Sequence, residues 1–361
     1  MRAWSAVIVL VPALYAFACS APTSNDDVVE SAAANLSSEA LVKSTAYLDR
    51  QATAWVSKTD WSFVQGGRCV MSCHTTAPFM MVRSQLPQTT GAASENAFAV
   101  VRGLVENRVN NWSSVAPLYS WVPAQSRGTE AVLNAFALVA ADSGATELSA
   151  TARKAVSLMW NEQQPDGSFK WWDSFNLAPW ENGEAGLWGA ALVDLTIGLA
   201  PASYGTSMTE QEKAKLDRLE GYLRTKAEDS ARPLNNRAMI LLASTYRPSL
   251  LPASTAKKIA DSMRALQAAD GSWTASSLGF TVAGGASAGA SAHAYATAFY
   301  TYVLGRTGDD ASAAKGRAWL EAHRRADGAW EAKSLNSPND EFNNQQITDA
   351  ATAYAMMALT R

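Results

Sequence analysis

A short motif built around Asp-Gly recurs three times and limits what this chain can fold into more than any other feature. The copies read NEQQPDGSF at 161–169, ALQAADGSW at 265–273 and AHRRADGAW at 322–330. Each copy follows a stretch rich in Ala, Lys and Arg, and a more apolar stretch follows it after a long loop. Glycine supplies the positive φ that ends a helix. The repeat therefore predicts units of amphipathic helix, turn, loop and apolar helix.

Weaker copies of the same unit bring the count to six helix pairs. The additional pairs are 41–56 with 74–86, 96–112 with 127–141, and 210–226 with 234–246. The second stretch of each unit has little polar face, which is typical of a helix buried on most sides. No strand pattern stands out, so we predict an all-α fold, a closed (α/α)6 toroid with the amphipathic helices outside. An open solenoid of hairpins is the alternative, but 347–359 lacks the polar face that a solenoid cap needs.

The N-terminus predicts export. Arg2 precedes an apolar run from Ala3 to Tyr15, and Ala16-Phe17-Ala18 fits a signal-peptidase site, so residues 1–18 are predicted to be a signal peptide. Cys19 at the cut predicts a lipid-anchored protein of the periplasm or outer membrane, acylated at that residue, with plain secretion as the alternative. Small polar residues predict a flexible tether over 19–38, which leaves 39–361 as a single toroid domain.

Composition narrows the class of protein further. Apolar residues make up 48% of the chain and 13 residues are Trp, which favours a sizeable core over disorder. The formal net charge is −3 and the charges are well mixed, so no basic patch predicts a nucleic-acid partner.

Two of the three cysteines and one of the three histidines lie within six residues. Cys69, Cys73 and His74 form C-x3-C-H, one residue longer than the common C-x2-C-H site of c-type haem attachment. Both thiols would bind haem c covalently while His74 binds the iron, and His293 is the candidate second ligand. A Cys69–Cys73 disulfide is the first alternative, since exported chains meet an oxidising compartment. A zinc site that uses both thiolates, His74 and a fourth ligand such as His293 or Asp349 is the second.

Polar residues gather near the predicted starts of the inner helices. Because these helices all run the same way in a toroid, their starts and the long loops meet at one rim. The residues are His74, Arg127, Glu130, Glu181, Glu184, Asn236, Arg237, His293 and Asp349. Arg127, Glu130, Glu181, Arg237 and Asp349 are the catalytic candidates. Glu130 is also a candidate for a buried ion pair with Arg127 or Arg237, and Asp349 and Asn235 for helix capping.

Several segments resemble known proteins. QAADGSW matches the Q-x-x-x-G-x-W repeat of the squalene–hopene cyclase and protein prenyltransferase superfamily. HTTAPFMM, SRGTEAVLNAFAL, LAPWENGEAGLWGAALVDLTIGLAPASYG, LNNRAMILLAS and TDAATAYAMMALT resemble a bacterial squalene-cyclase-like branch with an N-terminal Cys-x-x-Cys-His. The resemblance covers roughly residues 40–361 and implies an α/α toroid. It does not imply a reaction, because function depends on the site.

The expectations for function follow from these features. We expect an exported squalene-cyclase-like toroid that carries haem c at its rim, works with a redox partner and acts beside an apolar cavity on a hydrophobic, isoprenoid-like molecule. The first alternative is a binding module for such a molecule, with the disulfide. The second is a terpenoid cyclase or isomerase with a non-standard acid, since the D-x-D-D acid motif of the cyclases is absent. Trp273 and Trp330, in the repeats, are expected to pack loops onto helices.

Overall fold

The computed structural model describes residues 37–58, 69–86, 96–173, 178–281, 289 and 291–361. The predicted signal peptide, Cys19 and nearly all of the predicted tether lie outside these residues. The described part contains thirteen α-helices, one short 3-10 helix and two isolated β-bridges, but no strand. The prediction of an all-α fold is confirmed.

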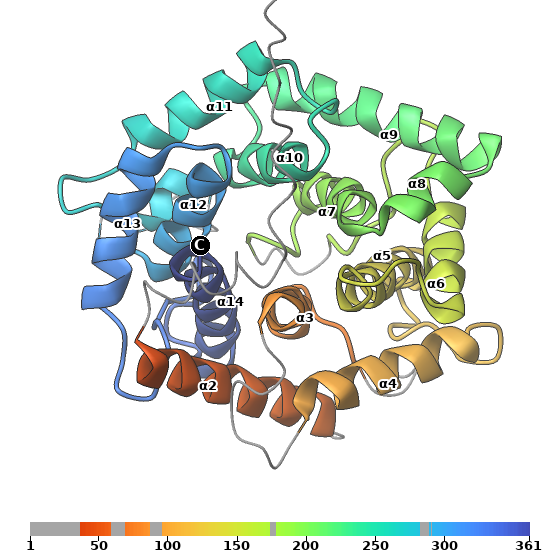
Figure 1. The fold of residues 1–361 in the computed structure, drawn as a ribbon, viewed down its shortest axis with the longest axis horizontal. Helices are drawn as coiled ribbons and strands as arrows, with labels where there is room; N and C mark the ends of the chain where they lie inside the picture. The colour runs from red at the N-terminus through yellow and green to blue at the C-terminus, as the bar shows by residue number, and fades with distance from the viewer. Residues whose placement is uncertain (1–36, 59–68, 87–95, 174–177, 282–288, 290) are drawn as a thin grey trace, which may run out of the picture.

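Twelve of the helices form six pairs, arranged as two concentric rings (Figure 1). The outer helices are α2 (Ser38–Ser57), α4 (Ala97–Asn110), α6 (Ala150–Asn161), α9 (Glu210–Glu228), α11 (Ala253–Ala265) and α13 (Asp310–Ala322). The inner helices are α3 (Thr76–Gln85), α5 (Pro123–Ala141), α7 (Ala185–Leu199), α10 (Leu234–Tyr246), α12 (Ala294–Arg306) and α14 (Glu341–Leu359). Two short elements, α8 (Ala202–Ser207) and the 3-10 helix η1 (Ala275–Leu278), complete the list.

The two rings differ in how much of each helix is buried. In the outer helix α11, burial is confined to a stripe that includes Thr255, Ile259 and Met263. In the inner helix α12, every residue from Ala294 to Leu304 is buried. A helix that is apolar or small on all sides needs neighbours on all sides, and only the inner ring supplies them.

The first and last helix pairs meet and close the ring. The Ser44 hydroxyl in α2 donates to the Gly328 carbonyl oxygen at 2.7 Å, and the Tyr47 hydroxyl donates to Asp349 Oδ1 in α14 at 3.0 Å. In Figure 1, α2 lies beside α14 although the two are at opposite ends of the described chain. The fold is therefore a closed (α/α)6 toroid and not an open solenoid.

The Asp-Gly turns connect each unit to the next outer helix. Gly167, Gly271 and Gly328 have φ values of 93°, 91° and 95°. A Cβ at these positions would collide with the backbone of α9, α13 and α2, respectively. In the second copy, the side-chain amide of Gln267 also donates to the carbonyl oxygen of Ser312 in α13 at 3.0 Å. The motif is thus a clamp between neighbouring units, which explains its repetition.

The tryptophans of the repeats are structural. Trp273 and Trp330 are fully buried. Their indole N–H groups donate to the backbone carbonyl oxygens of Met263 and Leu320, at 2.7 and 2.6 Å. Both side chains therefore pack the loop onto the end of the preceding outer helix, as the sequence predicted.

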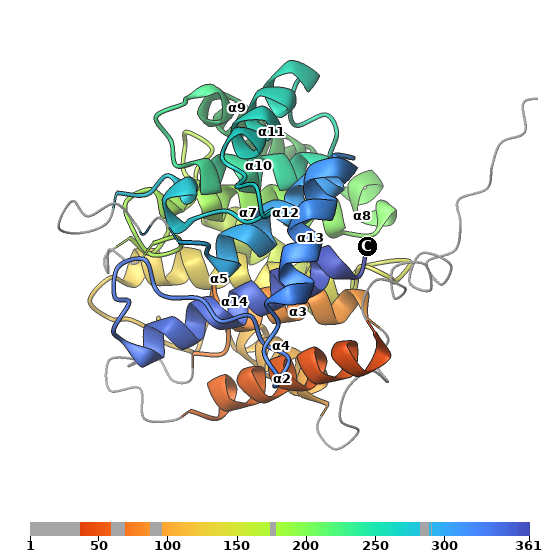
Figure 2. The same ribbon diagram turned by 90° about the vertical axis from the view of Figure 1, so that its left-hand side faces the viewer.

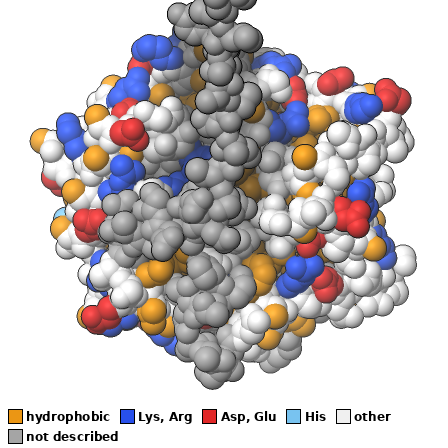
Figure 3. Space-filling model, in the orientation of Figure 1, with side chains coloured by type: hydrophobic (Ala, Val, Ile, Leu, Met, Phe, Trp, Pro, Cys, Tyr) orange, Lys and Arg blue, Asp and Glu red, His pale blue; other side chains and the backbone are white. Residues whose placement is uncertain are grey.

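The outside of the ring carries mixed charge. The side view in Figure 2 shows the outer helices wrapping the inner ones. On the face shown in Figure 3, acidic and basic side chains are interspersed around the ring without a large area of one sign. Among the described helices, none combines the length and the apolar character needed to cross a bilayer.

Candidate functional site

Aromatic rings from several segments meet where the inner helices begin. Trp180, in the loop before α7, lies 5.9 Å from the ring of His74, just before α3, and 5.2 Å from Tyr295 in the first turn of α12. Trp55, at the end of α2, also contacts His74, with 4.9 Å between the ring centroids. The rim predicted from the topology therefore exists, and His74 lies within it.

The imidazole of His74 is held in one orientation. Its Nδ1 lies 3.1 Å from the Thr75 hydroxyl, which donates its hydrogen to Asp349 Oδ2 at 2.8 Å. Because that hydrogen is used, Thr75 accepts from Nδ1–H and the lone pair of His74 lies on Nε2. Within the described residues Nε2 has no hydrogen-bond partner. Burial lowers the pKa of His74 to about 3, so the ring is neutral at pH 7.

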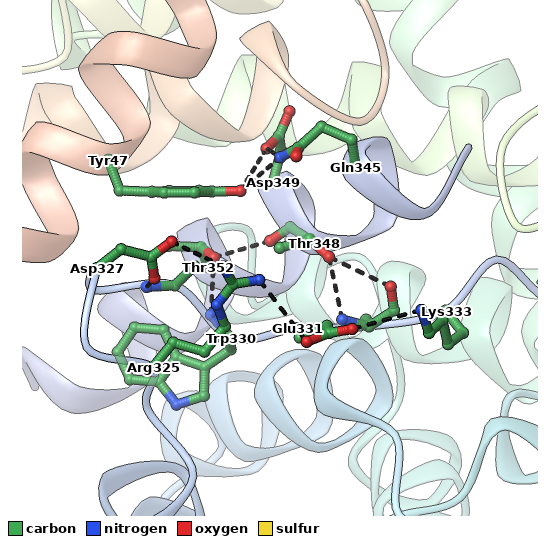
Figure 4. Close-up of polar contacts among 12 residues, drawn as sticks. Tyr47, Arg325, Asp327, Trp330, Glu331, Lys333, Gln345, Thr348, Asp349 and Thr352 are labelled. Atoms are coloured by element: carbon green, nitrogen blue, oxygen red, sulfur yellow. Dashed lines mark hydrogen bonds and ion pairs between the residues drawn. The ribbon is translucent and has the colours of Figure 1, made fainter. Parts of the chain in front are cut away.

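Asp349 is the final acceptor in this chain of hydrogen bonds, which runs from His74 through Thr75. Its carboxylate also accepts from the Tyr47 hydroxyl at 3.0 Å and from the Gln345 amide at 2.7 Å, and Figure 4 shows these two side chains converging on it. Burial raises the pKa of Asp349 to about 6, while its hydrogen bonds oppose that rise. At pH 7 the side chain is therefore mainly an ionised acceptor that orients His74 through Thr75.

The prediction that Asp349 begins and caps its helix is wrong. Helix α14 begins at Glu341, and Asp340 caps it by accepting from the backbone N–H groups of Phe342 and Asn343. The expected start at Ile347 missed the polar first turns of this helix, because their apolar period is weak. Asn235 does not cap α10 either: it is fully buried and accepts from the Tyr295 hydroxyl at 3.1 Å.

Glu181 faces the same small cavity as His74. The cavity has a volume of about 20 Å³, and its lining residues are His74, Ala178, Trp180, Glu181, Ser334, Asn343, Gln346 and Ile347. Glu181 keeps some exposed surface at the mouth, but the protein packed around it raises the pKa of its carboxyl to about 7. This cavity has room for one water molecule between a weakly acidic carboxyl group and a neutral imidazole.

Both cysteine thiols lie near Glu181, close enough for its charge to influence their pKa. Cys69 and Cys73 are both buried, and no disulfide joins them in this structure. Burial, and then the nearby carboxylates Glu130 and Glu181, raise the pKa of Cys69 to about 12, and burial, Glu181 and Cys69 raise that of Cys73 as well. Both groups are therefore thiols at neutral pH and weak nucleophiles. In the described part of the chain, no three His, Cys, Asp or Glu side chains are grouped so as to hold a metal ion.

The predicted haem site has suitable donors but not enough space. Two thiols and an imidazole with a free Nε2 are the groups that c-type attachment uses, and a held Nδ1–H is the usual orientation of a metal-binding histidine. However, the cavity beside His74 holds about 20 Å³, far less than a porphyrin needs. Trp180 and Glu181 occupy the mouth, and the backbone carbonyl of Trp180 accepts from Trp171 Nε1 at 2.8 Å. With this loop in place the residues do not fit a haem.

Glu130 is in a buried ion pair, but with a partner that the sequence did not indicate. The guanidinium of Arg108 in α4 donates to both carboxylate oxygens of Glu130 in α5, at 3.1 Å to Oε2. Arg127 instead lies over the ring of Trp112 at 4.5 Å, and Arg237 donates to the Ala227 carbonyl oxygen. The predicted pairing of Glu130 with Arg127 or Arg237 is wrong, because the outer helix packed against α5 supplies the charge.

His293 is engaged by the backbone on both ring nitrogens. Nε2 lies 2.8 Å from the carbonyl oxygen of Lys333, and Nδ1 accepts from the N–H of Ala296 at the start of α12. The ring therefore caps α12 and ties it to the loop before α14. A role as second iron ligand would require one of these bonds to break.

Aromatic side chains of the inner helices α12 and α14 pack against one another. Tyr295, Phe299 and Tyr354 are almost completely buried, and their rings contact one another with centroids 4.9 to 5.9 Å apart. An internal cavity large enough for a ligand would leave these rings accessible to a water-sized probe. The expected apolar cavity is therefore absent around these three residues.

Several members of the site were not identified from the sequence. Tyr47, Thr75 and Gln345 orient His74 through Asp349. Tyr119 lies close enough to Cys69 and Glu181 for their charges to raise its pKa, although burial is the larger cause. Only Thr75 had a local signal, its position next to His74.

Comparisons with known proteins support the architecture. No protein-family model matches the sequence, and no curated protein matches it either. A solved polysaccharide lyase superposes with a TM-score of 0.53 at 12% identity, over 94% of this chain and 97% of the lyase. A wild-type glycosidase aligns over 88% of this chain and 96% of its own, at 14% identity and a TM-score of 0.29. The chain shares the α/α toroid fold of the lyase, and at this identity the likeness extends to the fold alone.

Proposed function

We propose that this protein is an exported carbohydrate-active enzyme that hydrolyses glycosidic bonds at the rim of the toroid. The observation that carries the proposal is the pairing of Glu181 with His74 across one water-sized cavity. Glu181, with a pKa of about 7, is a carboxylic acid that still carries its proton near neutrality, as a general acid must. The lyase of similar fold supports a carbohydrate as the substrate class.

The reaction needs only these two groups and water. Glu181 donates its proton to the glycosidic oxygen as the bond between that oxygen and the anomeric carbon breaks. The water beside His74 forms the new carbon–oxygen bond and gives a proton to Nε2. The His74 pKa of about 3 belongs to the resting site. Once Glu181 has become an anion, its charge favours the imidazolium and raises the basicity of His74.

The test is a reducing-end assay with the full chain on a panel of neutral and acidic polysaccharides. Cleavage should fall as pH rises through about 7, where Glu181 loses its proton. Glu181→Gln should lower the rate by roughly 10²–10⁴-fold. Glu184→Gln is the matched control, because Glu184 lies three residues away and pairs with Arg232 at 2.9 Å.

Three kinds of result would contradict or change the proposed reaction. Cleavage that survives Glu181→Gln, or that rises above pH 7, contradicts the assignment of the acid. An unsaturated product that absorbs in the ultraviolet would show that the bond is cleaved by elimination and not by hydrolysis. A panel on which nothing is cut by the wild-type protein contradicts the proposed activity.

A covalent haem at Cys69 and Cys73 is the second candidate function. The free Nε2 and held Nδ1 of His74 favour it, and it requires the loop around Trp180 to leave the mouth. Expression with a c-type maturation system should then add the mass of one haem, which survives denaturation and is lost in the Cys69→Ala, Cys73→Ala double variant. An unmodified mass rules out this candidate, and a loss of two hydrogens on oxidation points to the Cys69–Cys73 disulfide.

Chemistry on a long isoprenoid has less support. The chain resembles squalene cyclases but lacks their D-x-D-D acid. The rings of Tyr295, Phe299 and Tyr354 on the inner helices are almost completely buried, so no space for a folded hydrocarbon lies around them.

A further inference from the structure

A second depression lies beside the mouth, between the starts of α5 and α7. Its volume is about 320 Å³, and its lining residues are Ala124, Gln125, Gln164, Phe169, Lys170, Trp171, Asp173, Gly183 and Gly186. The phenyl and indole rings of Phe169 and Trp171 form a buried floor, while the amides, the amine and the carboxylate reach solvent. We call this depression the rim groove.

The polar groups of the rim groove include both donors and acceptors. The Gln125 amide and the Lys170 amine form no hydrogen bond to any described residue, so both are available to a ligand. The groove also contains the Asp173 carboxylate and the Gln164 amide, whose nitrogen donates to Ser168 at 2.8 Å. Sugar hydroxyls both donate and accept, so such a mixture suits them better than a ligand of single charge.

An exposed aromatic side chain, Trp121, lies three residues before Ala124, which lines the rim groove. Trp121 is 50% exposed, which is unusual for a side chain of this size. It is held by edge contacts to Trp172 and Tyr119, with ring centroids 5.7 and 6.4 Å away. Trp121 precedes the lining residues Ala124 and Gln125 in the chain, and Trp172 lies between Trp171 and Asp173. A rigid, half-exposed indole beside a polar groove is a surface on which a pyranose ring can stack.

Two lining residues connect the rim groove to the segment that carries Glu181. Gly183, which lines it, is two residues after Glu181, and Trp171, in its floor, bonds to the backbone of Trp180. A chain of sugar units lying in the groove would therefore lead to the cavity between Glu181 and His74. No ring has to enter the 20 Å³ cavity itself, because the water occupies it and the glycosidic oxygen needs to reach only Glu181, which keeps exposed surface at the mouth.

We propose that the rim groove binds an extended, uncharged oligosaccharide, with one sugar ring stacked on Trp121 and the next hydrogen-bonded by Gln125 and Lys170. This inference rests on the proposed function and names its substrate class. It also assigns binding to residues that take no part in proton transfer, so the two can be tested apart.

The experiment measures binding without turnover. Calorimetry with the full chain carrying Glu181→Gln uses xylo-, cello-, manno- and malto-hexaose as neutral probes and oligogalacturonate as the acidic one. At least one neutral hexamer should bind. Added Trp121→Ala and Lys170→Gln should each weaken it by about tenfold, and Trp121→Phe should keep most of the affinity because a ring remains for stacking. Leu266→Ala and Lys333→Gln, which remove an exposed apolar side chain and an exposed amine elsewhere, should leave binding unchanged.

The outcomes separate this inference from the proposed function. Three results would overturn the rim groove as the binding site for a neutral oligosaccharide. They are an unchanged affinity in Trp121→Ala, binding of the acidic probe alone, and no binding of any probe. Cleavage that depends on Glu181 would leave the proposed function in place in each of these cases. The opposite result is also possible to distinguish. If Trp121→Ala and Lys170→Gln abolish binding but Glu181→Gln does not slow cleavage, the rim groove stands as the binding site and the acid–base assignment is overturned. Thermal midpoints by circular dichroism identify any variant that fails to fold.

Discussion

At the scale of single residues, the state of His74 depends on side chains far away in the sequence. Thr75 is its neighbour, but Asp349 and Tyr47, which direct the Thr75 hydroxyl, are 302 residues apart from each other. An imidazole buried without this arrangement could present either nitrogen to the cavity. The hydrogen bonds therefore convert an ordinary buried histidine into one with a free Nε2 at the mouth.

Thr75→Val should remove this control while keeping the size of the side chain. Without the hydroxyl, the Nδ1–H of His74 loses its acceptor, so the two tautomers should mix, which ¹⁵N chemical shifts of the ring would report. Cleavage should fall roughly 10- to 100-fold, the usual effect of losing a group that orients a functional histidine. Thr75→Ser keeps the hydroxyl and should keep both the tautomer and the rate. A Thr75→Val protein with the wild-type tautomer would contradict the orientation role.

Glu130→Gln tests the buried ion pair at the same scale. Removing the charge leaves the Arg108 guanidinium buried without its counter-ion, and breaking such a pair costs about 3–5 kcal/mol. Glu106→Gln is the matched control, because Glu106 pairs with Arg102 at 2.8 Å on the surface of one helix, where such pairs contribute about 0.3–0.5 kcal/mol. Urea denaturation should show the large difference in unfolding free energy, and equal losses would mean that the Arg108–Glu130 pair is not structurally important.

At the scale of elements, the Asp-Gly turns carry two functions at once. The positive φ of Gly328 forms the turn in the loop after α13, and the missing side chain lets this turn approach the backbone of α2 at Lys43 and Ser44. The same geometry recurs at Gly271 against α13. Each turn therefore combines a local left-handed residue with a long-range contact between units. The prediction that this glycine ends the preceding helix is wrong, because α6, α11 and α13 end at Asn161, Ala265 and Ala322, several residues before the turn.

Gly308 offers a way to separate the two functions. Its φ is 80°, but a Cβ there would have open space around it. Gly308→Ala should cost about 1–2 kcal/mol of unfolding free energy, the strain of a left-handed alanine. Gly328→Ala should cost about 1–3 kcal/mol more, because the new methyl group collides with α2. Similar midpoints for the two variants in urea would show that the turn does not clamp the ring.

At the scale of the whole molecule, ring closure brings both ends of the described chain to one site. Helix α2 supplies Tyr47 and α14 supplies Asp349, so the orientation of His74 depends on closure. An open solenoid of the same six pairs would leave these groups on opposite ends. The site and the architecture are therefore linked.

Export concerns the whole molecule as well. If Cys19 is acylated after cleavage of residues 1–18, the protein should fractionate with membranes, and Cys19→Ser should release it into the soluble fraction. Ser20→Ala is the control, since it changes the neighbouring residue and leaves the thiol. A Cys19→Ser protein that stays with the membranes to the same degree would mean that something other than this lipid holds it there.

The sequence by itself determined the helix pairs, their alternation and the all-α class. These depend on local information: the apolar period along each helix, the Asp-Gly turn that follows an outer helix, and the small residues that let an inner helix pack on all sides. The position of Glu181 and His74 at one rim also followed, because the direction of each helix is given by its place in the alternation.

The pairing of charges, the nitrogen of His74 that faces the cavity and the packing of the rings on α12 and α14 follow from the tertiary structure alone. Arg108 meets Glu130, Tyr47 meets Asp349, and Tyr295 meets Tyr354 across helices whose spacing and rotation are not encoded in any short segment. The same is true of the loop that places Trp180 in the mouth and leaves about 20 Å³ where a haem was expected. Side chains from distant helices fill that space together, and a volume shared by several helices has no local signature in the sequence.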